Sequence, residues 1–122
     1  MKILIIDDEE SFCQNLKPFL ERKNYEVICS YTGKEGLEVF KKEKPPLVFL
    51  DYYLEEGLTG DKILEEIKKI NPSCRVVLIT GSPEDLSEAL LKKGASLYLS
   101  KPLNLSTLKE VLERLTQGKE EQ

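Results

Sequence analysis

The chain of 122 residues contains no histidine and no tryptophan, and it has only one methionine and three cysteines. The missing histidine excludes Ser-His-Asp catalysis, histidine-ligated metal sites and imidazole pH switches. Any chemistry in this protein must therefore rely on carboxylate, hydroxyl and lysine side chains.

The three cysteines, Cys13, Cys29 and Cys74, are odd in number and lack the CxxC spacing that is typical of metal and redox sites. We expect buried free thiols in a reducing cytoplasm rather than a metal site.

Long hydrophobic runs are also missing, so no segment approaches the length of a membrane-spanning helix. The N-terminal residues MKILIIDDEE become acidic too early for a secretion signal. A formal net charge of -4 argues against direct nucleic-acid binding, because that requires a basic face. We therefore expect a cytoplasmic protein that binds neither membranes nor nucleic acids directly.

The length fits one domain over residues 1–122, with an ordered core over about residues 2–116. The last six residues, QGKEEQ (117–122), are expected to form a polar tail or the first residues of a linker.

Short apolar runs without polar alternation predict strands that are covered on both faces. They are residues 3–6, 27–29, 47–50, 76–79 and 97–99. Between them, apolar residues recur with helical spacing and predict helices that turn one face to the core. The clearest of these faces are Phe12, Leu16, Phe19 and Leu20; Ile63, Leu64, Ile67 and Ile70; and Leu105, Leu108, Val111, Leu112 and Leu115.

Helix boundaries agree with this division. Thr32 and Ser82 each precede an acidic residue by three positions, which is the capping-box pattern, and Pro83 fits the first position of a helix over about residues 83–93. Gly94 fits the left-handed position after a helix, and Asn104 fits the start of the last one. The order (βα)5 predicts an α/β fold in which a parallel five-stranded sheet carries helices on both faces.

Ligands of an open parallel sheet bind beyond the carboxyl ends of its strands, so the residues that follow each run are the candidate site. These residues are Asp7, Asp8, Asp51, Thr80 and Lys101. If the first and third strands are neighbours, three carboxylates meet, and their repulsion requires a cation such as Mg²⁺. Asp51 could then attack phosphorus as a nucleophile, while Thr80 and Lys101 bind phosphoryl oxygens.

Each of these residues, taken alone, fits a helix cap or a surface position equally well. We interpret Glu9 and Glu10, for example, as acids in the first turn of a helix. The combination of acids, a hydroxyl and an amine at the ends of four strands is what predicts a site.

The segments ILIIDDEE, LVFLDYYL, VVLITGS and ASLYLSKPL resemble the receiver domain of two-component response regulators, over about residues 2–116. The resemblance implies a doubly wound, flavodoxin-like sheet in the order 2-1-3-4-5. It also implies Mg²⁺-dependent transfer of a phosphoryl group from a kinase phosphohistidine to Asp51. Such a domain is a signalling module rather than an enzyme, although it promotes its own phosphorylation and dephosphorylation.

The same resemblance implies individual roles. Asp8 and Asp51 would bind Mg²⁺ directly, Asp7 would act more through water, and the backbone carbonyl of Tyr53 would be a further ligand. The other implied roles are contact with the phosphoryl group for Thr80 and Lys101, a rotamer switch for Tyr98, and a cis bond between Lys101 and Pro102.

The expected partners also follow from the resemblance. The donor would be a sensor histidine kinase or a phosphotransfer protein, and the output would pass to a downstream protein or to an output domain outside these residues. A homodimer through the fourth helix, the fifth strand and the fifth helix is also possible.

Two features depart from the family. Glu55 stands where a proline usually lies four residues after the acceptor, and the stretch to Gly60 is one residue longer than in the commonest pattern. Two alternatives stay open at this point. An aspartate-based phosphatase would need a second aspartate at the position of Tyr53, and an unphosphorylated receiver-like interaction module would need no chemistry.

Overall fold

The computed structural model describes residues 1–54, 58–81 and 86–120, with side chains to residue 116. In these ranges strands and helices alternate along the chain. The strands are β1 (Lys2–Ile6), β2 (Glu26–Ser30), β3 (Leu47–Asp51), β4 (Arg75–Thr80) and β5 (Leu97–Ser100). The helices are α1 (Glu10–Arg22), α2 (Gly33–Glu43), α3 (Gly60–Ile70), α4 (Ser87–Lys92) and α5 (Leu105–Glu120).

The strands form one parallel sheet in the order β2-β1-β3-β4-β5, which confirms the expected topology. The strand order reverses between β1 and β3, where Ile6 lies opposite Leu50. A crevice forms at such a reversal because the connections from the two strands leave toward opposite faces of the sheet. The residues that follow β1 and end β3 therefore lie at the natural ligand position of this fold.

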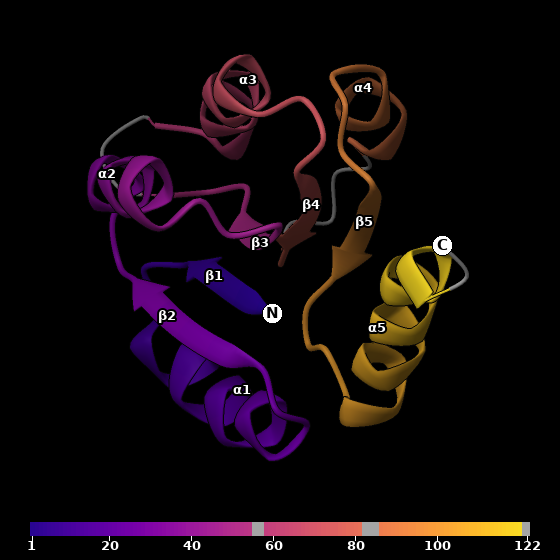
Figure 1. Cartoon of the computed structure of the whole chain (residues 1–122). Helices are drawn as coiled ribbons and strands as arrows, with labels where there is room; N and C mark the ends of the chain where they lie inside the picture. Colours follow the sequence, from indigo (N-terminus) through magenta and orange to yellow (C-terminus); the bar gives the residue numbers. More distant parts are fainter. Residues whose placement is uncertain (55–57, 82–85, 121–122) are drawn as a thin grey trace.

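The sheet lies between two helical layers (Figure 1), with α1 and α5 on one face and α2, α3 and α4 on the other. Strand residues alternate between the two cores, because successive side chains of a strand point to opposite faces. Ile3 and Ile5 pack with Leu16 and Leu108 under α1 and α5. Leu4, Ile6 and their neighbours pack under the other three helices. Burial on both faces explains why the strands appear in the sequence as uninterrupted apolar runs.

Several helix ends follow the sequence signals. The Thr32 hydroxyl accepts a hydrogen bond from the Glu35 N–H, Gly94 adopts a φ of 109°, and the Asn104 side chain accepts from the Thr107 N–H. Helix α4 begins at Ser87, and the cap expected at residues 82–85 lies outside the described residues. Helix α5 continues to Glu120, so residues 117–120, expected as part of a tail, are helical.

Two expected core residues are instead exposed. Ile70 and Leu105 are 41% and 47% exposed, whereas Ile63, Leu64, Ile67 and Leu108 are buried. Both exposed residues lie at a helix end, Ile70 as the last residue of α3 and Leu105 as the first of α5. Helical spacing alone does not show where the covered part of an apolar face stops.

The expectation of three free thiols was wrong for two of them. Cys13 of α1 and Cys29 of β2 form a disulfide, and their Cα atoms lie 6.3 Å apart, while Cys74 is free and buried. The cause is the fold, because α1 packs against the sheet beside β2, so two cysteines that are distant in sequence come within disulfide range.

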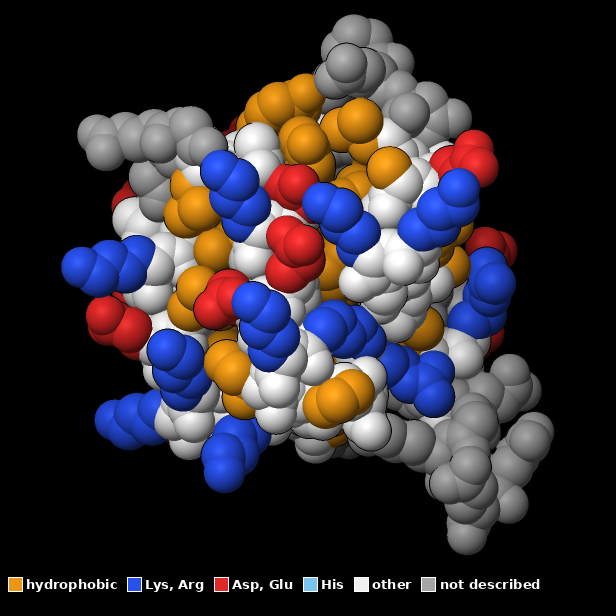
Figure 2. Space-filling model, turned by 90° about the horizontal axis from the view of Figure 1, so that it is seen from above, with side chains coloured by type: hydrophobic (Ala, Val, Ile, Leu, Met, Phe, Trp, Pro, Cys, Tyr) orange, Lys and Arg blue, Asp and Glu red, His pale blue; other side chains and the backbone are white. Residues whose placement is uncertain are grey.

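Lysines are placed at the helix ends far from the carboxyl edge of the sheet. The last turns of α2, α3 and α4 carry Lys41 and Lys42, Lys68 and Lys69, and Lys92. Figure 2, which views the molecule from the side of α3 and α4, shows Lys and Arg side chains gathered on this face. Cations at helix C-termini complement the helix dipole, which accounts for the lysines in these last turns.

None of the described helices has both the length and the apolar character that a membrane span requires.

Candidate functional site

Three carboxylates converge at the carboxyl edge of β1 and β3. Asp7 and Asp8 follow β1, and the Asp7 N–H donates to the carbonyl of Ser30 at 3.0 Å, which continues the strand path by one residue. Asp51 is the last residue of β3. Asp7 is 1% exposed, Asp51 is 7% exposed and Asp8 is open to solvent. One oxygen from each of the three lies within 4.8 Å of the others.

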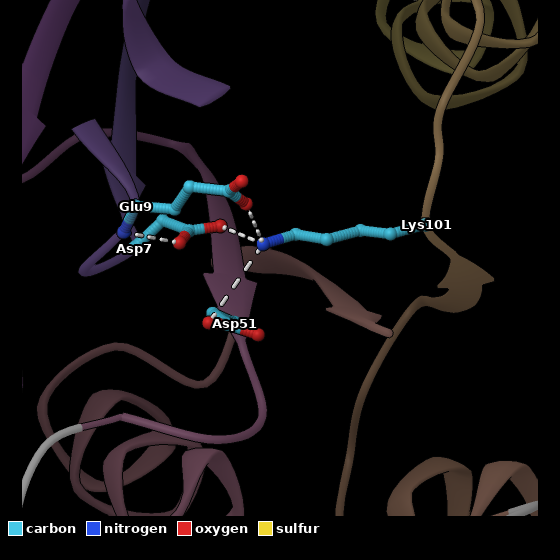
Figure 3. A network of polar contacts seen from close by, with 4 residues as sticks. All are labelled: Asp7, Glu9, Asp51 and Lys101. Atoms are coloured by element: carbon cyan, nitrogen blue, oxygen red, sulfur yellow. Dashed lines mark hydrogen bonds and ion pairs between the residues drawn. The ribbon is translucent and has the colours of Figure 1, made fainter. Parts of the chain in front are cut away.

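The Lys101 ammonium enters this group from the end of β5 (Figure 3). The Lys101 N–H donates to the carbonyl of Thr80 at 2.8 Å, so the backbone of Lys101 is fixed beside β4. Its Nζ lies 2.8 Å from Oδ2 of Asp7, 3.0 Å from Oε1 of Glu9 and 3.9 Å from Oδ2 of Asp51. Lys101 therefore bridges acids that come from both β1–α1 and β3.

The surroundings of Asp51 disfavour the charged form of its carboxyl group. Burial raises the pKa of Asp51 to about 7, and the carboxylates of Asp7 and Asp8 add to this shift while Lys101 opposes it. Burial alone would lower the pKa of Lys101, but hydrogen bonds to Asp7 and Glu9 and the charge of Asp51 raise it above its ordinary value. Lys101 thus stays charged, and its one positive charge faces three acids, Asp7, Glu9 and Asp51.

The donor set suits a small, hard cation. Carboxylate oxygens are the ligands that Mg²⁺ prefers, and Mg²⁺ keeps several waters, for which the exposed position of Asp8 leaves room. The raised pKa of Asp51 indicates that the carboxylates lack compensating charge, which a cation would supply. These residues can therefore hold a metal ion.

Tyr53 lies two residues after Asp51 and forms an isolated antiparallel bridge with Thr59. Its side chain is 45% exposed and contacts the ring of Tyr52 edge to face. Glu55, the departure from the family pattern, lies outside the described residues.

The close packing of α3 on the strand end depends on Gly60. The Gly60 N–H donates to the carbonyl of Tyr52 at 2.6 Å. A Cβ at this position would lie 2.7 Å from the carbonyl oxygen of Asp51 and 2.9 Å from Cα of Tyr52. The first turn of α3 can therefore sit directly against the backbone of Asp51 only because residue 60 has no side chain.

Thr80 and Tyr98 lie on the two strands at the other side of the site. Thr80 is fully buried, ends β4 at the same edge as Asp51, and lies opposite Ser100. Tyr98 lies opposite Leu78 and is half-buried against the core beneath α2, α3 and α4.

The structure thus brings Asp7, Asp8, Asp51 and Lys101 together, and the bond between Lys101 and Pro102 is cis as expected. The sequence interpretation missed Glu9, which was taken only as an acid of a first helical turn. The acidic run DDEE gave no indication of which acid turns toward the lysine. That direction is set by the backbone conformation at the start of α1.

Residues 3–113 match the family model of the response regulator receiver domain. The chain is 35% identical over 104 residues to the alkaline phosphatase synthesis transcriptional regulatory protein PhoP of Bacillus subtilis, covering 84% of this chain and 43% of that protein. It is 37% identical over 114 residues to the transcriptional regulatory protein ZraR of Escherichia coli strain K12, covering 92% and 25%. The chain thus spans less than half the length of these two regulators.

Solved structures of the same family have the same fold. A response regulator receiver domain protein from Clostridium thermocellum superposes with a TM-score of 0.89 at 35% identity, covering 98% of this chain and 96% of the other. The family match extends over nearly the whole sheet and its helices, and it includes all the residues of the acidic group. The chain therefore belongs to the receiver domains of two-component response regulators, and its acidic group at the carboxyl edge of the sheet is consistent with their phosphorylation site.

Proposed function

We propose that Asp51 accepts a phosphoryl group, in a Mg²⁺-dependent reaction, from the phosphohistidine of a sensor kinase or phosphotransfer protein. One observation carries this proposal. Asp51 ends a buried strand with the carboxylates of Asp7 and Asp8 and the ammonium of Lys101 all directed at the same small volume. A cation site next to a carboxylate nucleophile is the arrangement that phosphoryl transfer requires.

In the reaction, a carboxylate oxygen of Asp51 forms a bond to phosphorus as the bond between phosphorus and the donor nitrogen breaks. The imidazole departs, and Asp51 becomes an acyl phosphate. When bound, Mg²⁺ would neutralise negative charge on the transferring group. We assign direct metal contacts to Asp8 and Asp51, a contact through water to Asp7, and a backbone carbonyl contact to Tyr53.

The hydroxyl of Thr80 and the ammonium of Lys101 would bind the phosphoryl oxygens, which turns new negative charge at Asp51 into movement of these two side chains. A shift of Thr80 opens space beside β4, and we assign Tyr98 as the aromatic residue that responds by becoming more buried. This change alters the surface of α4, β5 and α5, which we propose as the site for a downstream partner or a second copy.

The output of the whole protein is part of this proposal. PhoP and ZraR are named as transcriptional regulatory proteins, and each is more than twice as long as the matched segment. We propose that this receiver signals either through a downstream protein or through an output domain outside these residues, and not through direct contact with nucleic acid.

Incubation with acetyl phosphate and Mg²⁺, followed by intact-mass measurement, tests the proposal. Wild type should gain one phosphoryl group that is lost on exposure to base, as expected for an acyl phosphate. Asp51→Ala should gain none, and omission of Mg²⁺ should prevent uptake. Asp61→Asn is the matched control. Asp61 pairs with Lys93 rather than Lys101, so this variant should take up the phosphoryl group as wild type does. Unchanged uptake by Asp51→Ala would refute the assignment.

A further inference from the structure

Glu9 occupies an unusual position for an acid at the start of a helix. It is the N-cap residue of α1, with φ -87° and ψ 98°, but its side chain makes no capping hydrogen bond. Its backbone is fixed at both ends, because its N–H donates to Oδ1 of Asp7 at 2.9 Å and its carbonyl accepts from the Phe12 N–H at 3.0 Å. The carboxylate is thereby directed toward Lys101 instead of its own helix (Figure 3).

Most contacts of the Lys101 ammonium come from this one segment of chain. Asp7 and Glu9 lie at 2.8 and 3.0 Å, and the ring of Phe12 lies 4.6 Å below the ammonium, at a cation–π distance. Asp51, on β3, lies at 3.9 Å, which is longer than the distance to either of these two carboxylates. In this state the ammonium therefore lies closer to Asp7 and Glu9, on the α1 side of the site, than to Asp51.

We propose that Glu9 is a positioning residue that competes with Asp51 for the Lys101 ammonium and so slows phosphoryl uptake. This inference rests on the proposed function. If Lys101 is to neutralise the group on Asp51, its Nζ must give up part of its contact with Glu9.

The contact is not needed to hold the fold together. The Glu9 side chain is 57% exposed, and ion pairs with one partner this open to solvent contribute little to stability. Lys101 is anchored independently, through its backbone bond to Thr80 and its pair with buried Asp7. Removing the Glu9 charge should therefore change the reactivity of the site and leave the fold intact.

Glu9→Gln and Glu10→Gln form a matched pair for the test. Both remove one negative charge from the start of α1, but Glu10 is exposed and belongs to the helix, and the structure gives it no contact with Lys101. The measurement is the rate of phosphoryl uptake from acetyl phosphate, as a function of donor concentration, with Mg²⁺ held constant. We expect Glu9→Gln to react about threefold faster than wild type, within the range for a partly exposed ion pair. Glu10→Gln should react at the wild-type rate.

The same substitution in a Lys101→Ala background isolates the contact. If Glu9 acts through Lys101, Glu9→Gln should have no effect on the rate there, as a double-mutant cycle requires for coupled residues. The NMR signal of the Lys101 ammonium should also shift, relative to wild type, in the unphosphorylated Glu9→Gln variant. It should not shift in the Glu10→Gln variant.

The results distinguish a failure of the proposed function from a failure of the role of Glu9. A wild-type chain that takes up no phosphoryl group overturns the proposed function and this inference with it. If wild type reacts but Glu9→Gln reacts at the same rate as Glu10→Gln, only the role of Glu9 is overturned. The same holds if the increase in rate caused by Glu9→Gln is also seen in the Lys101→Ala background. A Glu9→Gln variant that takes up the phosphoryl group more slowly than wild type would also overturn this role, because Glu9 would then prepare Lys101 for the reaction.

Discussion

At the scale of single residues, the buried carboxylate of Asp51 lowers the stability of the fold, although the proposed function requires it. Its pKa is raised to about 7 by burial and by the neighbouring acids, from an ordinary value of 3.8. A group whose pKa is higher in the folded chain contributes stability that is fully present below the pKa of the unfolded chain. That contribution is lost as the pH rises through the folded pKa. The metal-free protein should therefore lose stability between about pH 4 and about pH 7.

Replacement of Asp51 by Asn should remove this loss. At pH 8 without metal, the free energy of unfolding should rise by up to about 4 kcal/mol, from about 1.36 kcal/mol per pKa unit. The difference should shrink as the pH falls toward 5. Urea unfolding in EDTA at several pH values measures it.

Asp61→Asn is the control with the opposite sign. Burial alone would raise the pKa of Asp61, but the hydrogen bond from Thr59 and the pair with Lys93 lower it. Its contribution is present above the unfolded pKa and is lost as the pH falls through the folded one. Asp61→Asn should therefore cost stability at pH 8, by less than about 1 kcal/mol for so exposed a pair. A lower stability for Asp51→Asn at pH 8 would show that Asp51 is structural.

Metal binding should follow from the same repulsion. Mg²⁺ should raise the melting temperature of wild type by mass action, and less so below pH 7, where protons compete for Asp51. Asp8→Ala should melt higher than wild type without Mg²⁺ and bind Mg²⁺ more weakly. Thermal melts across a Mg²⁺ titration test this. If Asp8→Ala melts lower and Mg²⁺ shifts neither protein, the carboxylates do not form a metal site.

The residues brought together at the site could be predicted from the sequence because each lies within two positions of the end of an apolar run. Asp7, Asp51 and Lys101 needed only the rule that parallel strands share a carboxyl edge. The role of Glu9 could not be predicted, because the direction of its side chain depends on backbone torsions at a helix cap. The disulfide between Cys13 and Cys29 was missed because it depends on the packing of α1 beside β2.

At the scale of elements, the site depends on how closely α3 approaches β3. The strands were predicted to within one residue at each end, because burial on both faces leaves continuous apolar runs. The ends of apolar helix faces were less certain, as the exposed Ile70 and Leu105 show. Spacing gives the face of a helix, but neighbouring elements decide how much of it is covered.

Gly60→Ala should separate α3 from the strand end. The new Cβ would clash with the backbone of Asp51 and Tyr52, which cannot move as a flexible side chain does. We expect a loss of about 1–3 kcal/mol in the free energy of unfolding, together with weaker Mg²⁺ binding.

Gly81→Ala is the control for Gly60→Ala. Among the residues that the structure describes, the nearest heavy atom to its Cβ would be Cβ of Lys101, at 3.9 Å, which is ordinary van der Waals contact. Gly81→Ala should therefore stay close to wild type in urea unfolding and Mg²⁺ titration. Equal losses for the two variants would mean that the approach of Gly60 to Asp51 has no special role.

At the scale of the whole molecule, phosphorylation of Asp51 should be detected on the face of α4, β5 and α5. Beryllofluoride with Mg²⁺ mimics the phosphoryl group, and NMR shift mapping with and without it should show changes at Tyr98 and across residues 86–115. Lys101→Ala should bind or accept the group yet leave this face unchanged, because the new charge no longer attracts the ammonium. Shifts confined to the loops around Asp51 in wild type would refute the switch.

The location of the phosphoryl group tests the proposed role of Asp51 most directly. Borohydride reduces an aspartyl phosphate to homoserine, which marks the acceptor in a peptide map. After incubation with acetyl phosphate and Mg²⁺, we expect homoserine at position 51 and unchanged aspartates at positions 7 and 8. Homoserine at Asp7 or Asp8, or phosphorylated protein without homoserine at position 51, would contradict this role.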